Sequence, residues 1–281
     1  MNRLSLTKRA QILSALVEGT AINAIVRMTG VSKVTILKLL KDVGEACLTF
    51  ENKALRNLPC RHIECDEIWS FCYAKEKNVP RDKQGQFGYG DVWTWTAIDA
   101  ETKLLCSWMI GDRSAVTARA FMQDLAARLA NRVQLTTDGH RAYLEAVESA
   151  FGVNVDYAML VKLYGNDRET EARYSPAVCI GCRKIEITGS PEPEHVSTSH
   201  VERHNLTIRM HMRRFTRLTN AHSKKIQNHQ HAFALHSVFY NFVKINQAIR
   251  VTPAMEAGIA DHVWSIEELV SLLDRSVNIA A

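Results

Sequence analysis

Three acidic residues occupy positions in the sequence where a carboxylate could do chemistry. Asp66 lies inside the apolar, strand-like segment HIECDEIWSF, where a buried carboxylate is costly unless it is paired or binds a metal. Asp138 directly follows a short apolar strand in LTTDGHRAY, and Glu202 lies near the start of an expected helix in SHVERHNLTIRMHMRR. Three such carboxylates could converge on Mg²⁺ or Mn²⁺, and two such ions can promote a phosphoryl displacement.

Each acid also has a simpler structural interpretation. The strand could be an edge strand with one solvated face, and Glu64 or Glu67 could take the role of the strand acid. The Asp-Gly pair that follows the second strand is common in turns. Glu202 stands three residues after Ser199, which is the spacing of a capping box that closes a helix N-terminus.

The helix that begins near Glu202 carries further polar groups. Asn205 and Arg209 stand three and seven residues later and therefore share its face. Such a face suits a metal and a phosphate lying along it. Residues 203–225 contain no acid and seven basic residues, which favours a polyanionic partner over a solvated surface: Arg203, Arg209, Arg213, Arg214, Arg217, Lys224 and Lys225.

A second basic region occupies the N-terminus, where residues 1–58 hold nine Lys and Arg against four Asp and Glu. Apolar spacing predicts helices over residues 7–18, 21–28 and 32–43, with Ser32 capping the third and Gly30 in the turn before it. Two helices joined by such a turn form a helix-turn-helix, whose second helix enters the DNA major groove. The residues that could face DNA are Ser32, Lys33, Thr35 and Lys38. A plain three-helix bundle remains the alternative.

The chain after residue 58 alternates strands and helices. Strand patterns cover residues 62–71, 92–99, 104–111, 133–137 and 155–161, and helical patterns cover 114–131, 141–150, 201–217 and 224–247. Residues 44–60 are expected to be a helix and a linker, and residues 165–198 a long loop. This order predicts an α/β fold with a mixed sheet. We divide the chain into a helix-turn-helix domain with its linker (1–58), a catalytic domain (59–250) and a C-terminal extension (251–281).

Three motifs resemble those of the DDE transposases of the insertion-sequence-one type, a bacterial family with a ribonuclease-H-like core. They are DEIWSF at 66–71, TTDGHRAY at 136–143 and VERHNLTIRMHMRRFTRLTNAHSKK at 201–225. The resemblance spans residues 60–247 and is most distinctive in the last motif. The chain departs from the founding members at its N-terminus, where they carry a cysteine-based zinc element and this chain has no cysteine before Cys47.

The resemblance implies a function and a site. By motif match, Asp66, Asp138 and Glu202 take the catalytic, metal-binding positions, with Asn205 and Arg209 as accessory residues. The family's activity implies a transposase that binds terminal inverted repeats, cleaves DNA and joins 3′-hydroxyl ends to target DNA with Mg²⁺ or Mn²⁺. Two DNA ends must meet, so a homo-oligomer, at least a dimer, is expected. A bacterial, cytoplasmic location at the nucleoid would follow.

Other classes of protein stay possible on the sequence alone. A helix-turn-helix regulator without catalysis, or a structure-specific nuclease that cuts without joining, would carry the same motifs. A zinc-stabilised interaction module would rest on Cys179 and Cys182, a single CxxC pair to which His195 and His200 could contribute. Seven irregularly spaced cysteines favour reduced thiols, and no apolar run is long enough to predict a membrane span.

Overall fold

The protein has an α/β fold in which a mixed sheet is flanked by helices, as the order of predicted elements indicated. The computed structural model describes residues 4–164, 179–216 and 219–277. The six strands are β1 (His62–Cys72), β2 (Gly90–Asp99), β3 (Leu105–Gly111), β4 (Val133–Asp138), β5 (Val155–Tyr164) and β6 (Cys179–Thr188). The main helices are α1 (Leu6–Val17), α2 (Ile22–Thr29), α3 (Lys33–Ala54), α4 (Ala115–Ala126), α5 (Ala142–Phe151), α6 (Ser199–His211), α7 (Ile226–Val238), α8 (Pro253–Glu256) and α9 (Ile266–Val277).

The first three helices begin and end where the local sequence requires. The hydroxyl of Ser5 accepts a hydrogen bond from the amide of Lys8 at the start of α1. Helix α2 ends at Gly30, whose φ of 70° is left-handed and therefore suits glycine. Ser32 caps α3 through the amide of Thr35, so the predicted cap is confirmed. Helices α2 and α3 are thus joined by a short turn.

Helix α3 is longer than the sequence predicted. It continues without a break to Ala54, where a helix end near Val43 and a separate helix after it were expected. Gly44 does not end the helix but permits a close approach of α7, because a Cβ added there would lie 2.6 Å from the Cα of His231. The glycine is therefore a packing residue, and this use of glycine leaves no signal in the local sequence.

The sheet has the strand order β3-β2-β1-β4-β5-β6. Strands β1, β2 and β3 pair antiparallel, and the predicted hairpin of β2 and β3 is confirmed. Strands β4 and β5 run parallel to β1, and β6 runs antiparallel to β5. Strand β6 was not expected, since its segment was assigned to a loop. Most of its side chains are exposed, so it is held by backbone pairing and shows little apolar pattern.

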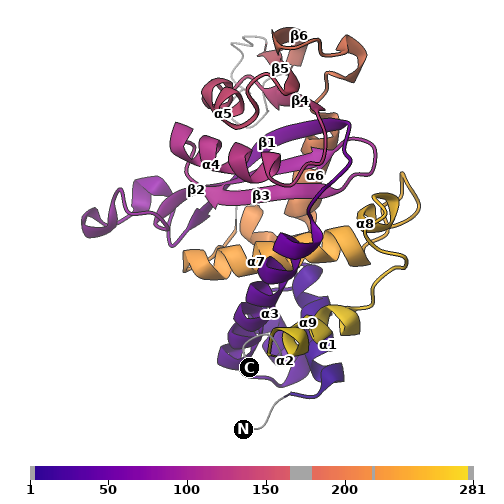
Figure 1. Cartoon of the computed structure of the whole chain (residues 1–281). Helices are drawn as coiled ribbons and strands as arrows, with labels where there is room; N and C mark the ends of the chain where they lie inside the picture. The colour runs from indigo at the N-terminus through magenta and orange to yellow at the C-terminus, as the bar shows by residue number, and fades with distance from the viewer. Residues whose placement is uncertain (1–3, 165–178, 217–218, 278–281) are drawn as a thin grey trace.

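Helices cover both faces of the sheet, and on one face a second group of helices packs outside the first. Figure 1 shows α4 and α5 on one face, α6 and α7 on the other, and α7 lying between the sheet and the group formed by α1, α2, α3 and α9. The ring of Phe233 on α7 lies 4.8 Å, centroid to centroid, from that of Trp108 on β3. Helix α6, which carries Glu202, contacts β1 and β2 directly.

One hydrophobic cluster joins all of these layers. It includes Ile12 of α1, Leu40 of α3, Trp95 of β2, Phe233 of α7 and Leu269 of α9, all buried. The N-terminal helices therefore share their apolar contacts with elements from the end of the described chain, and the boundary near residue 58 stays a prediction. None of the helices in the described ranges has the length and apolar character that crossing a bilayer requires.

Candidate active site

Two of the three predicted acids lie side by side at the centre of the sheet. Asp66 is on β1 and Asp138 ends β4, and these neighbouring parallel strands pair up to Cys65 and Thr137, one residue before each acid. One carboxylate oxygen of each lies within 4.8 Å of the other. The amide of Glu67 donates to Asp66 at 2.8 Å, and the amide of His140 donates to Asp138 at 3.0 Å. Both carboxylates are thus oriented by backbone donors.

A third acid, Glu67, also belongs to this cluster. Its carboxylate lies within 4.8 Å of those of Asp66 and Asp138, although its side chain is buried. Arg113 bridges the cluster, because its Nη2 is 3.2 Å from Glu67 and 3.7 Å from Asp138. The guanidinium also lies 4.7 Å above the ring of Trp93. Arg113 therefore supplies positive charge where the acids meet.

The acid cluster is strained electrostatically. Burial, with the nearby charges of Asp138 and Glu202, raises the pKa of Asp66 to about 7. Burial, with the charges of Asp138 and Asp66, raises the pKa of Glu67 to about 8, and Arg113 opposes that rise. A cation bound between such carboxylates would offset their mutual repulsion and the cost of burying their charge, and so favour their ionised forms.

The start of α6 is held by a residue that the sequence left open. The carboxylate of Glu64 on β1 accepts from the amides of His200 at 2.7 Å and Val201 at 3.0 Å. Helix α6 has Thr198 as its N-cap residue, with no capping bond from its side chain. The capping-box interpretation of Glu202 is therefore wrong: Glu64 occupies the helix N-terminus, and the side chain of Glu202 has another environment.

Helix α6 brings Glu202 and Asn205 next to the two strand acids. The amide nitrogen of Asn205 donates to Asp66 at 2.7 Å, while its buried Oδ1 accepts no hydrogen bond from the described residues. Glu202, one turn earlier, pairs with Lys162 of β5 and accepts from the hydroxyl of Thr198. It is close enough to influence the pKa of Asp66 but is not in the tight cluster of the other acids.

The donor set of this site fits a hard divalent cation. Asp66 and Asp138 offer carboxylate oxygens from adjacent strands, and Glu202 approaches from the helix that Asn205 holds against Asp66. Oxygen donors without histidine or thiolate are those that Mg²⁺ and Mn²⁺ prefer. Arg209 is half-buried one turn beyond Asn205 on α6. The catalytic and accessory roles of these residues stay predictions.

The predicted DNA-reading residues lie at the exposed start of α3. Ser32, Lys33, Thr35 and Lys38 are all exposed. Ser32 also hydrogen-bonds to the hydroxyl of Thr35 at 2.9 Å, and Lys38 forms an ion pair with Asp42 at 2.6 Å. All four polar side chains therefore lie together at one exposed helix start. Their role in binding DNA stays a prediction.

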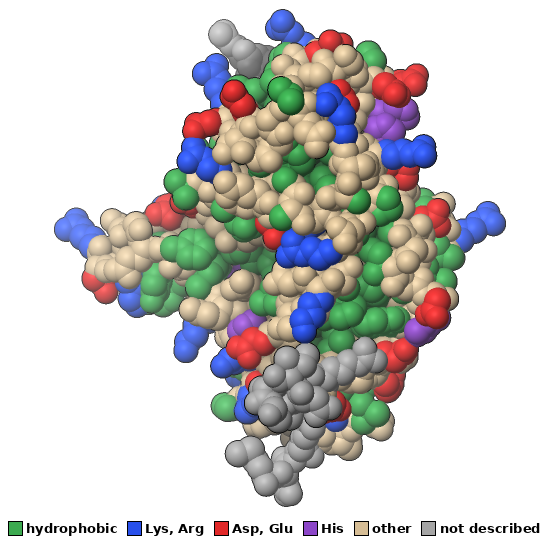
Figure 2. All heavy atoms as spheres, in the orientation of Figure 1, with side chains coloured by type: hydrophobic (Ala, Val, Ile, Leu, Met, Phe, Trp, Pro, Cys, Tyr) green, Lys and Arg blue, Asp and Glu red, His purple; other side chains and the backbone are tan. Residues whose placement is uncertain are grey.

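The residues of the second basic region have different surroundings. Arg203, Arg213, Lys224 and Lys225 are exposed, whereas Arg214 is half-buried and donates to Ser223 at 2.8 Å and to the carbonyl of Asn228 at 2.9 Å. Arg217 lies outside the described residues. On the face shown in Figure 2, Lys and Arg side chains are scattered among Asp and Glu side chains and do not form one continuous basic patch.

Two residues of the site were missed by sequence reasoning. Arg113 stands alone in the turn between β3 and α4, and nothing in its neighbours marks it. Lys162 had a weak signal, since it is a single charge in the apolar strand MLVKLY. A lone lysine in a strand next to a strand-end acid could have been assigned to the site. Cys179 and Cys182 are exposed thiols on β6.

Comparison with known proteins gives distant structural likenesses. No family model and no curated protein sequence matches the chain. A structure described as the piggyBac transposase synaptic complex with hairpin DNA is similar over 97% of this chain and 72% of that one, at 11% identity and a TM-score of 0.42. The Mos1 transposase paired-end complex with left transposon end matches 56% of this chain and 60% of that one, at 13% identity and a TM-score of 0.24. Both scores are low, so the function must be argued from the residues of the site.

Proposed function

We propose that the protein is a DDE transposase that binds the terminal inverted repeats of an insertion sequence, cleaves DNA and joins the 3′-hydroxyl ends to target DNA. The observation that carries this proposal is the hydrogen bond from Asn205 to Asp66. It fixes α6 against the strand acids, so that Glu202 approaches the pair formed by Asp66 and Asp138. In this proposal Glu202 would join Asp66 and Asp138, so that three acids from distant parts of the chain would share one metal site.

The proposed chemistry divides the work among these residues. Asp66 and Asp138 would hold Mg²⁺ or Mn²⁺ together with Glu202, which approaches from α6. When bound, such a metal pair activates the attacking oxygen and stabilises the leaving one. Asn205 keeps the Asp66 carboxylate in place, and the Arg209 side chain would contact the scissile phosphate from the same helix. Cleavage leaves a 3′-hydroxyl, whose oxygen then forms a bond to a target phosphorus as the target P–O3′ bond breaks.

The remaining elements would hold the DNA. In this proposal, α2 and α3 form a helix-turn-helix in the N-terminal domain (1–58), which reads bases through the exposed polar residues at the start of α3: Ser32, Lys33, Thr35 and Lys38. A ribonuclease-H-like catalytic domain (59–250) contacts phosphates through the exposed basic residues around α6, and residues 251–281 form an extension that includes α9. Because two DNA ends must be brought together, the active form would be at least a dimer, located at the bacterial nucleoid.

The proposal is tested by cleavage and joining with the full chain. The purified protein is incubated with labelled duplexes taken from the DNA that flanks its coding sequence, together with supercoiled target DNA and Mg²⁺. We expect metal-dependent cuts at the element ends and covalent joining of the labelled 3′ ends to target DNA. Asp138→Asn is the inactive control, because the neutral amide binds a hard cation far more weakly.

Other outcomes would assign a different function. Sequence-specific binding with no cleavage in Mg²⁺ or Mn²⁺ would indicate a regulator built on the same fold. Cleavage without joining would indicate a nuclease. Cleavage that persists in Asp138→Asn would show that the activity comes from elsewhere.

A further inference from the structure

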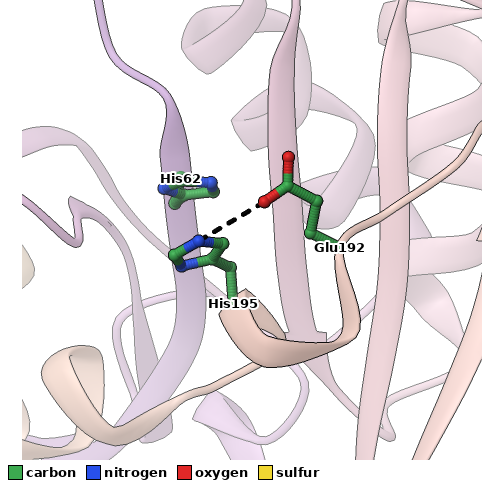
Figure 3. A group of neighbouring side chains, drawn as sticks. All are labelled: His62, Glu192 and His195. Atoms are coloured by element: carbon green, nitrogen blue, oxygen red, sulfur yellow. Dashed lines mark ion pairs between the residues drawn. The ribbon is translucent and has the colours of Figure 1, made fainter.

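A second cluster of possible metal ligands lies at the N-terminal end of β1, four residues before Asp66. His62 begins β1, while Glu192 and His195 lie in the segment between β6 and α6. One donor atom from each lies within 4.8 Å of the other two. Figure 3 shows the ring of His62 above that of His195, with Glu192 beside them. The two rings are stacked with centroids 4.0 Å apart, and His195 Nε2 is 3.4 Å from Glu192.

The cluster has an outer partner of the kind that orients a histidine ligand. The carboxylate of Glu101 contacts Nδ1 of His62, which leaves Nε2 of that ring available to a metal. Histidine ligands in metal sites commonly donate their second nitrogen to a carboxylate, which fixes the tautomer and the ring orientation. The side chain of His62 is only 17% exposed, so its ring is already confined.

The backbone of the cluster is also held in place. The side-chain amide of Gln134 donates to the carbonyl of Glu192 at 3.0 Å and accepts from the amide of Glu192 at 2.7 Å. Gln134 lies on β4 directly beside His62 of β1 in the parallel register. The two segments that supply the ligands are therefore connected through one glutamine.

We propose that His62, His195 and Glu192 bind one Zn²⁺ ion, with Glu101 orienting His62. Two imidazoles and a carboxylate suit Zn²⁺, whereas the oxygen-only acid cluster suits Mg²⁺. Ligand atoms around tetrahedral zinc lie about 3.3 Å apart, as follows from zinc–ligand bonds of about 2.0 Å. The separation of His195 and Glu192, 3.4 Å, already has this value. Water, or Glu194 with its carboxylate 3.7 Å from His195, completes the set.

The position of this site gives the ion a structural role. It joins the first residue of β1 to the segment that leads directly into α6. Glu64, two residues after His62, binds the first amides of α6, so the ion and Glu64 would hold the same helix start from two points. The proposal concerns residues outside the acid cluster and does not depend on the proposed activity.

Zinc binding is measured with tag-free, full-length protein in competition with a chromophoric chelator, with Mg²⁺ in excess to occupy oxygen-only sites. We expect about one Zn²⁺ per chain and a higher Tm when Zn²⁺ is added. His195→Ala should abolish this binding, and Glu101→Gln should weaken it by about 10–100-fold, the usual effect of losing an outer partner.

His262→Ala is the matched control, because His262 also contacts two carboxylates, those of Asp261 and Glu268, but has no second imidazole among them. It should bind Zn²⁺ like the wild type. The proposal is overturned if the wild type binds no Zn²⁺, or if His195→Ala binds it as tightly as His262→Ala does. It is also overturned if binding survives in His195→Ala but is lost when Cys179 and Cys182 are replaced by serine, because the ion would then belong to the thiols.

Discussion

Two glutamates near the start of α6 have separate tasks, and this division decides what each substitution should do. Glu64 is buried on β1 and binds the amides of His200 and Val201. Glu202 is 40% exposed and faces Lys162 and Thr198. The first therefore supports the helix, and the second is available for the proposed chemistry.

For Glu202→Gln we expect a nearly unchanged Tm and loss of both cleavage and joining. Its ion pair with Lys162 is partly exposed and is worth at most about 1 kcal/mol. The amide still accepts from Thr198 but is a poor ligand for Mg²⁺. Thermal melting and the cleavage assay on the same preparation measure the two effects. Retained cleavage would contradict the ligand role of Glu202.

Substitution of Glu64, in contrast to that of Glu202, should lower the stability of the fold. Glu64→Ala leaves the buried amide of Val201 and the part-buried amide of His200 without this acceptor, which costs about 1–3 kcal/mol of folding free energy. Glu64→Gln keeps a neutral acceptor and should lose less. Urea unfolding of both variants gives the comparison. Equal stability of Glu64→Ala and the wild type would show that the helix start does not depend on this contact.

At the scale of elements, α3 connects the N-terminal helices to the rest of the protein through polar and apolar contacts. Glu51 of α3 accepts from the hydroxyl of Ser237 on α7 and from the indole of Trp108 on β3 at 3.2 Å. Gly44 lets α7 approach the same helix closely. One helix thus holds α7 and the sheet edge together.

The buried carboxyl of Glu51 should make stability depend on pH. Burial raises its pKa from 4.5 to about 7, so the folded state holds the proton more tightly than the unfolded state. The protonated Glu51 therefore contributes its full stabilisation below the pKa that this carboxyl has in the unfolded chain, and the protein loses it as the pH rises through about 7. Wild type should therefore lose about 3 kcal/mol relative to Glu51→Gln between about pH 4 and pH 8. Denaturant unfolding of both proteins across this pH range tests the prediction. If their unfolding free energies change with pH in the same way, the raised pKa of Glu51 is refuted.

The close contact of α3 and α7 predicts a large effect from one methyl group. Gly44→Ala would force its Cβ against His231 and should destabilise the protein by about 1–3 kcal/mol. Gly181→Ala on β6 is the control, because the nearest atom to its new Cβ is 3.9 Å away. The difference in Tm between the variants measures the effect. If the two variants have similar Tm values, α3 and α7 can move apart to accommodate the added methyl group at little cost.

The elements that bury apolar side chains could be predicted, and those held by backbone or by single close contacts could not. Strands β1 to β5 follow apolar segments, and Ser32 caps α3 as expected. The exposed strand β6 and the continuous course of α3 past Gly44 left no local pattern. In the site, Asp66 and Asp138 were indicated by their places in strands, whereas Arg113 reaches them only through the fold.

On the scale of the whole molecule, the N-terminal helices cannot be considered separately from the elements that follow. Helix α9 packs against α1 and α3, and α7 packs along α3. All of them contribute to one hydrophobic cluster. Helix α3, whose start is the proposed DNA-binding surface, is therefore packed against elements from residues 226–277.

Deletion of residues 1–58 should consequently damage the whole protein. It would uncover the sides of α7 and α9 that pack against α1 and α3. We expect the truncated chain to aggregate or to melt at a much lower temperature than the full chain. Light scattering and thermal melting measure this. A truncated chain with the Tm of the full protein would show that the helices form an independent domain.

The packing of α9 also affects the order in which the protein can be completed during synthesis. Helix α3 ends at Ala54, but α9 begins at Ile266. At about 5–20 residues per second, the ribosome needs roughly 10–40 s to pass from one to the other. For that time the apolar surfaces of α1 and α3 that α9 covers stay open to solvent and to chaperones. A chain whose translation stops within this interval lacks α9 and keeps these apolar surfaces exposed.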